Sequence, residues 1–151
     1  MKKSLFLVAA TGVFGLASPA LLAHTDEVLD TQQAPNGGQL RMAGAYHYEL
    51  VVAKDSKEAK DKPVVVYVTD HAGTKVPTGG ASGTATILAG KSKATATLLP
   101  AGDNRLKGTA RYASAADMKV VVSITFPGKS AEQARFTPMT AAKDGHTGHK
   151  H

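Results

Sequence analysis

The chain has 151 residues, a formal net charge of +6, no cysteine and no tryptophan, and it is 42% hydrophobic but only 5% aromatic. That length allows one domain of ordinary size. The lack of cysteine excludes disulfides, thiolate metal sites, iron–sulfur clusters and cysteine nucleophiles. The core must therefore be built mainly from aliphatic side chains.

Residues 1–23 have the features of a secretory signal peptide. Two lysines precede an apolar run over residues 5–17, and small residues follow. The apolar run is too short to remain as a membrane anchor. Cleavage is expected after Ala23, with Ala20 as the alternative. The segment predicts a periplasmic protein whose mature chain has no membrane span.

The charge and motif content argue against two classes of function. Without the two signal-peptide lysines the net charge is +4 (18 − 2 basic against 12 acidic residues). The lysines are scattered and aromatic residues do not interleave with them, so nucleic-acid binding is not indicated. The chain has no nucleophile elbow, no HExxH pair and no phosphate-binding glycine loop. We therefore expect a protein that is not an enzyme.

A polar leader of residues 24–35 is predicted to precede a β-domain of residues 36–138. The domain opens on the turn signal Asn36-Gly37-Gly38. Beyond it, apolar and polar residues alternate with period two, and turn residues recur about every 8–12 positions. This pattern predicts a single antiparallel β-sandwich of about seven strands, with an open barrel as the alternative.

The predicted strands are short and are separated by turn residues: they cover residues 46–52, 64–69, 84–89, 93–99, 106–112, 118–126 and 134–136. In the first strand, Tyr48 and Leu50 share one face, and His47 and Glu49 share the other. The second strand is β-branched and apolar on both faces, which is typical of a central strand. Gly90-Lys91 predicts a hairpin between the third and fourth strands.

The tail, residues 139–151, is predicted to be disordered and carries the clearest metal-binding signal. His146, His149 and His151 follow Asp144 within a few residues. Imidazoles bind late first-row divalent ions and copper, and a flexible segment can bring several of them to one ion. The alternative is a solvated tail without a ligand. The pattern favours copper or zinc without deciding between them.

Two more histidines are candidate ligands. If cleavage falls after Ala23, His24 becomes the mature N-terminus, where its amine and ring nitrogen can chelate Cu(II) together. The alternative is that histidine merely follows the cleavage site. His47 shares a predicted strand face with Glu49, about 7 Å away by strand geometry, so the two could hold one ion. We favour the alternative, in which they form an exposed polar face.

The remaining donors are predicted to have structural roles. Asp70 and His71 end a predicted strand and point to opposite faces, so they are poor co-ligands, and Asp70 is expected in a turn. Met118 is in register with the apolar face and should be in the core. Met42 lies close to His47 and could join a soft-metal site, although core packing is the favoured interpretation.

Several motifs occur in a fixed order along the chain: residues 35–40 (PNGGQL), 46–51 (YHYELV), 66–71 (VYVTDH), 75–77 (KVP) and 99–104 (LPAGDN). This succession resembles small exported proteins encoded near heavy-metal resistance systems in proteobacteria. It is also similar to the amino-terminal β-domain of periplasmic adaptor subunits in metal-exporting RND-type pumps. The resemblance covers residues 36–137 and implies a metal-stress context, a β-sandwich and a non-enzymatic role. In that family histidine often stands where this chain has Asn36.

These features predict a periplasmic protein that binds or buffers copper, zinc or a similar cation in metal homeostasis or resistance. The candidate ligands are His146, His149, His151, His24 and His47. The alternative is a protein-interaction module that docks on an efflux-pump adaptor or another envelope partner and has no metal site.

Overall fold

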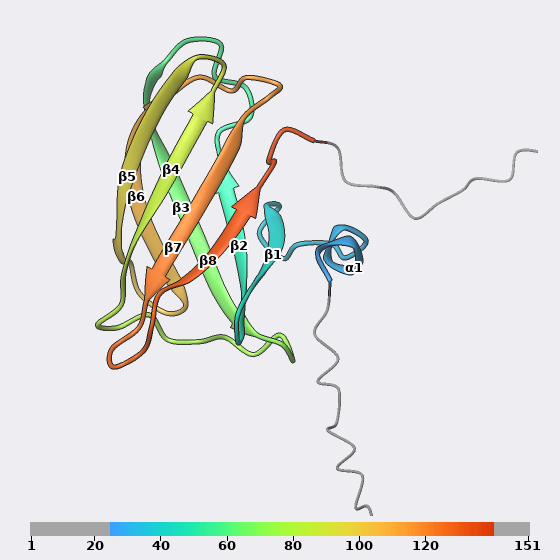
Figure 1. The fold of residues 1–151 in the computed structure, drawn as a ribbon, viewed down its shortest axis with the longest axis vertical. Helices are drawn as coiled ribbons and strands as arrows, with labels where there is room; N and C mark the ends of the chain where they lie inside the picture. The colour runs from blue at the N-terminus through green and yellow to red at the C-terminus, as the bar shows by residue number, and fades with distance from the viewer. Residues whose placement is uncertain (1–24, 141–151) are drawn as a thin grey trace, which may run out of the picture.

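The fold is that of a computed structural model, which describes residues 25–140 (Figure 1). The predicted signal peptide, His24 and the three tail histidines lie outside the described residues. Within them, one short helix and eight strands follow in chain order: α1 (Asp26–Asp30), β1 (Gln39–Ala43), β2 (Tyr46–Val52), β3 (Lys60–Asp70), β4 (Ser82–Ala89), β5 (Ser92–Pro100), β6 (Arg105–Tyr112), β7 (Lys119–Thr125) and β8 (Glu132–Phe136).

The strands form one antiparallel sheet that curls into a nearly closed shape. Their order is β1-β2-β3-β6-β5-β4-β7-β8. Strands β5 and β6 pair only through Leu99 with Lys107 and Pro100 with Leu106, so the sheet bends at this point into two four-stranded halves. At the other side, Figure 1 shows β1 and β8 next to each other without a ladder between them.

Side chains bridge the gap between β1 and β8. The main-chain N–H of Thr137 donates to Oε1 of Gln39 at 2.8 Å. The hydroxyl of Tyr48 donates to the carbonyl oxygen of Glu132 at 3.3 Å. These bonds join side chains of β1 and β2 to main-chain groups of β8 and of the residue that follows it, and so hold the halves of the sheet together, which limits the exposure of free strand edges.

The core lies between the two halves and consists of the inward-facing residues of the strands. Tyr48, Val66, Leu106, Val122 and Ile124 are among its fully buried members. Alternate residues point inward because successive side chains of a strand point to opposite faces. The predicted all-β antiparallel fold is confirmed, including the central position of β3, the β4–β5 hairpin and the burial of Met118.

Strand β1 is absent from the strands predicted above. It is five residues long and pairs with β2 across a two-residue turn, with Ala43 opposite Tyr46. Gly44 has a φ of 57° in this turn. A positive φ at the first central residue is typical of the tight type II′ hairpin, which favours glycine there. Ala43 before the turn and Gly44 within it have little β-propensity, so local pattern alone did not indicate a strand.

Helix α1 lies in the predicted polar leader and packs against β1 (Figure 1). Thr25 caps its first turn, and Leu29 is buried to 1% exposure. Arg41 of β1 holds the helix through an ion pair of 2.6 Å with Asp30. In addition, Oδ1 of Asp26 accepts the main-chain N–H of Met42 at 3.0 Å. The helix therefore covers the outer edge of β1. No helix among the described residues is long and apolar enough to cross a membrane.

Candidate functional site

The outward face of β2 is covered rather than open to solvent. His47 is 6% exposed and Glu49 is 3% exposed, so the prediction of an exposed polar face at these residues is wrong. The reason is tertiary. Residues 36–38 fold over Glu49, and the turn that follows β3 brings the ring of His71 onto that of His47. Burial of both faces makes β2 a strand whose polar residues need specific partners.

The carboxylate of Glu49 is held by the turn that opens the β-domain. Its Oε1 accepts the main-chain N–H of Asn36 at 2.7 Å and of Gly38 at 3.1 Å, and its Oε2 accepts Nδ2 of Asn36 at 2.9 Å. A buried carboxylate is stable when several N–H groups donate to it. Both carboxylate oxygens of Glu49 therefore accept hydrogen bonds from the turn, which leaves Glu49 poorly placed to share an ion with His47.

His71 is the partner that the structure brings to His47. The two rings are stacked, with centroids 5.0 Å apart and planes inclined by 19°. Nε2 of His71 lies 3.1 Å from the carbonyl oxygen of Gly44. When Nε2 donates its proton to this carbonyl, Nδ1 of His71 is the nitrogen with the lone pair. A carbonyl that orients a ring through its second nitrogen is a common arrangement around metal-bound histidines.

The turn that carries His71 is built by Asp70, as predicted. Oδ1 of Asp70 accepts the main-chain N–H groups of Ala72 and Thr74, both at 2.9 Å. A short polar side chain that bonds the main chain ahead of it stabilises such a turn. The sequence pattern placed His71 at a strand end without a partner. The contact between His71 and His47 could not be predicted without the register of β2 and β3. This register sets Thr69 opposite His47, so the turn that follows β3 lies over the ring of His47.

Met42 lies on the other side of His47. The β1–β2 register places the two residues directly opposite each other. Met42 is only half-buried and is not a member of the core cluster, so the interpretation that it packs in the core is wrong. Core positions on β1 belong to the alternate residues, such as Ala43. Among the described residues, no group of three or more His, Asp and Glu side chains gathers in a way that could hold a metal ion. Among the described residues, the arrangement most similar to a set of metal ligands is thus the His47–His71 pair with Met42 beside it.

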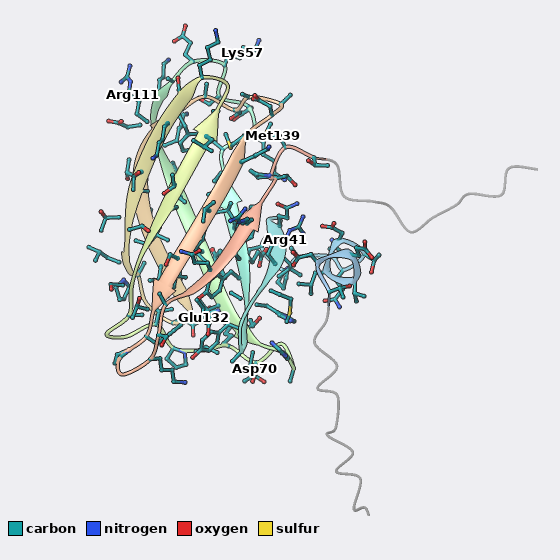
Figure 2. All side chains as sticks on the ribbon, in the orientation of Figure 1. Arg41, Lys57, Asp70, Arg111, Glu132 and Met139 are labelled. Carbon is teal, nitrogen blue, oxygen red and sulfur yellow. The ribbon has the colours of Figure 1, made fainter. Side chains whose placement is uncertain are left out.

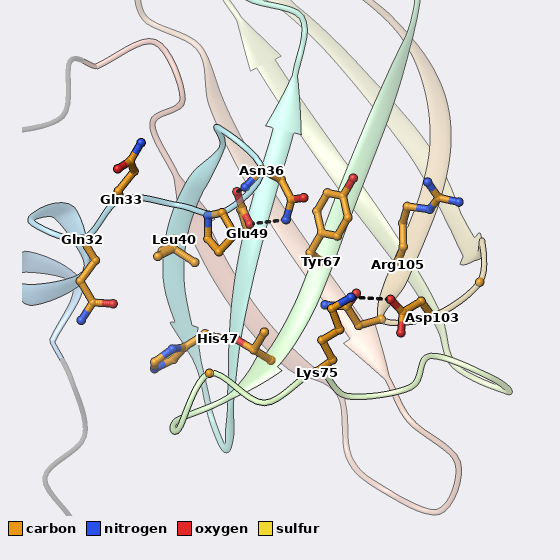
Figure 3. A pocket seen from close by; sticks show the side chains of 15 residues that line it. Gln32, Gln33, Asn36, Leu40, His47, Glu49, Tyr67, Lys75, Asp103 and Arg105 are labelled. Atoms are coloured by element: carbon orange, nitrogen blue, oxygen red, sulfur yellow. Dashed lines mark hydrogen bonds and ion pairs between the residues drawn. The ribbon is translucent and has the colours of Figure 1, made fainter.

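A cleft of about 720 Å³ extends from His47 across the outer face of β2 and β3 (Figure 3). Figure 3 shows His47 at one end and Arg105 and Asp103 at the other, with Asn36, Glu49 and Tyr67 between them. Nζ of Lys75 pairs with Oδ2 of Asp103 at 2.8 Å near the far end. The cleft therefore has a histidine at one end and charged side chains at the other.

Comparison with known proteins identifies no family for this chain. No protein-family model matches the chain, and no curated protein matches it. One solved structure that it is similar to is a conjugative transposon lipoprotein from Bacteroides eggerthii, at 9% identity and a TM-score of 0.34. The similarity covers 62% of this chain and 95% of that one. The chain's own fold defines its class, which is that of a small, nearly closed antiparallel β-protein.

Proposed function

We propose that this protein is an exported, non-enzymatic metal-binding protein that buffers copper, zinc or a similar cation in the periplasm. The observation that supports this proposal is the stacked pair of His47 and His71, one from a strand and one from a turn. Two imidazoles from separate elements can meet at one ion, and the Gly44 carbonyl orients the second ring.

The two histidines can share one cation after one ring turns, because an imidazole lone pair lies in the plane of its ring and the two planes are inclined by only 19°. Metal–nitrogen bonds of about 2.0–2.1 Å require the two ligating nitrogens to lie about 4 Å apart or closer. The ring centroids are 5.0 Å apart and the rings are stacked, so binding requires the ring of His71 to rotate and approach that of His47. His71 is on a turn, which lets its ring move without breaking a strand ladder.

His24 and the tail residues His146, His149 and His151 remain predicted ligands of the same protein. They lie outside the described residues, so each needs its own test. His24 directly precedes Thr25, the cap of the helix whose Asp26 bonds the main chain of Met42. The tail histidines could form a second site with its own affinity.

Calorimetric titration of the full mature chain with Cu(II), Zn(II) and Ni(II), and with Cu(I) under anaerobic reducing conditions, tests the proposal. Three variants test the candidate ligands separately: His71→Ala, His24→Ala, and a triple substitution of the tail histidines by alanine. Lys75→Ala on the same turn is the matched control, because its exposed ion pair with Asp103 contributes little to stability. We expect His71→Ala to weaken binding at least about tenfold and Lys75→Ala to leave it unchanged.

Binding should also weaken below about pH 6.5, where ordinary imidazoles take up a proton and lose the ligating lone pair. If the full chain binds no cation more tightly than about 10 µM, the metal proposal fails and the interaction-module alternative gains support. If only the tail variant loses binding, the His47–His71 pair is not the site.

A further inference from the structure

Met42 gives the histidine pair a third donor of a different chemical kind. Resting on the metal-binding function proposed above, we propose that Met42, His47 and His71 form a site selective for a soft monovalent cation, Cu(I) or Ag(I). The ligands would be one thioether sulfur and two imidazole nitrogens. This narrows the class of cation and assigns Met42 the role of a ligand, for which the sequence alone favoured core packing.

The strand pairing places Met42 close to His47. The main-chain N–H of Met42 points away from β2, because it donates to Oδ1 of Asp26 at 3.0 Å. Met42 and His47 are therefore a non-hydrogen-bonded pair of the antiparallel ladder, the kind whose Cα atoms are about 4.5 Å apart and whose side chains are closest. Both side chains project from the outer face of the sheet, on which His71 stacks.

The donor set matches a soft cation better than a hard one. Thioethers select Cu(I) and related ions, whereas carboxylate and carbonyl oxygens suit harder ions. The nearest carboxylate on the same strand face, that of Glu49, is already bonded by Asn36 and Gly38. The Glu49 carboxylate is thus occupied by the turn, while thioether and imidazole donors lie on the same outer face of the sheet.

The charge of the ligand set also favours a monovalent cation. Methionine and two neutral imidazoles carry no negative charge, so a bound divalent ion would leave a double charge beside the buried ring of His47. The cost of burying an ion rises steeply with its charge, and a monovalent ion avoids most of that cost. Neutral ligands in a covered site therefore favour the +1 state of copper over the +2 state.

The test uses the full mature chain with the three tail histidines replaced by alanine, which removes competing imidazoles. Ag(I) serves as an air-stable probe for Cu(I), and Zn(II) is the divalent, less soft comparison. The variants are Met42→Leu and His71→Ala, with Met139→Leu as the matched control. Met139 is a partly buried methionine at the opposite end of the sheet from Asp70, as Figure 2 shows. Leucine replaces methionine with little change in volume, so the fold should be retained.

We expect Met42→Leu to lower the affinity for Ag(I) at least about tenfold and to change the affinity for Zn(II) by no more than about twofold. Met139→Leu should change neither affinity. X-ray absorption of the Cu(I)-loaded chain should show a copper–sulfur distance that Met42→Leu removes. Unchanged Ag(I) affinity and an unchanged absorption spectrum in Met42→Leu would overturn this inference. If His71→Ala still abolishes binding in that case, the proposed function stands without Met42. If His71→Ala also has no effect, the histidine pair is not a metal site and this inference fails, whereas the proposed function is then decided by the titrations of the His24 and tail variants.

Discussion

The main-chain N–H of Asn36 lies 2.7 Å from Oε1 of Glu49, and the side-chain amide of Asn36 lies 2.9 Å from Oε2 of the same carboxylate. One residue of the opening turn thus binds both oxygens of a buried acid on β2. This relationship gives the asparagine and the glutamate of the PNGGQL and YHYELV motifs a shared structural role. It also orients one wall of the cleft that begins at His47.

Replacing Glu49 by glutamine should destabilise the protein by about 1.5–3 kcal/mol, the usual value of hydrogen bonds to a charged group. Glutamine presents one amide N–H₂ to donors that need an acceptor, so at least one N–H of the turn loses its partner. Urea denaturation measures the loss. Glu58→Gln is the control, because the Glu58 side chain is 77% exposed and pairs only with Lys60 among the described residues. Equal midpoints for both variants would contradict the buried-carboxylate argument.

Gly38→Ala should destabilise the same turn for a steric reason. A Cβ atom at Gly38 would lie 2.4 Å from the carbonyl oxygen of Leu50 and 2.9 Å from Cγ of Glu49. Main-chain atoms cannot move aside cheaply, so we expect a loss of about 1–3 kcal/mol. Gly79→Ala is the control, since a Cβ atom there would meet no described atom within 4 Å and the φ of Gly79 is not positive. A thermal melt in which Gly38→Ala is as stable as Gly79→Ala would refute the steric argument.

Arg41→Met should loosen helix α1. The side chain of Arg41 is 10% exposed and contacts Asp30 at 2.6 Å, whereas that of Asp30 is 26% exposed. An ion pair that is largely buried on one side contributes more than a surface pair, so its loss should cost about 1–3 kcal/mol. Hydrogen exchange should then rise across residues 25–31. Lys60→Met, in an exposed pair with Glu58, should leave that exchange unchanged. No gain in exchange for Arg41→Met would show that the burial of Leu29 and the bond between Asp26 and the Met42 main chain hold the helix without the ion pair.

Alkaline pH should destabilise the protein through its buried tyrosines. Burial raises the pKa of Tyr48 well above its ordinary value, and the nearby charge of Glu132 adds to this. Burial also raises the pKa of Tyr112, opposed by the hydrogen bond that the Ala53 N–H donates to its hydroxyl. The folded state therefore keeps protons that the unfolded state loses from about pH 10 upward, so the free energy of unfolding falls as pH rises through that range.

Urea denaturation midpoints measured from about pH 8 to pH 11 test whether the free energy of unfolding falls as pH rises. Tyr48→Phe should be less stable than the parent at neutral pH, because it loses the bond to the Glu132 carbonyl, yet its stability should fall less on the alkaline side. The parent and the variant share all lysines and arginines, so the difference in slope isolates Tyr48. Parallel pH curves would mean that Tyr48 ionises in the folded state as it does in the unfolded chain.

Much of the strand pattern followed from the sequence alone. Period-two alternation placed Tyr48 and Leu50 on the inner face and identified the later strands, because one face of each strand must be buried. Local pattern missed β1 and helix α1. Both are short, and their stability comes from contacts with distant residues, such as the Arg41–Asp30 pair and the β1–β2 ladder, rather than from propensity.

The neighbours of His47 and Glu49 in the candidate site could be identified only from the tertiary structure. Strand alternation is enough to place His47 and Glu49 together on the face opposite the core, because successive side chains of a strand point to opposite sides. Only the folded chain decided that this face is covered, that Glu49 bonds Asn36 rather than an ion, and that His71 and Met42 flank His47. Register between strands and the path of a turn fix those neighbours. Both are set by pairings across the whole sheet, which no local window of sequence contains.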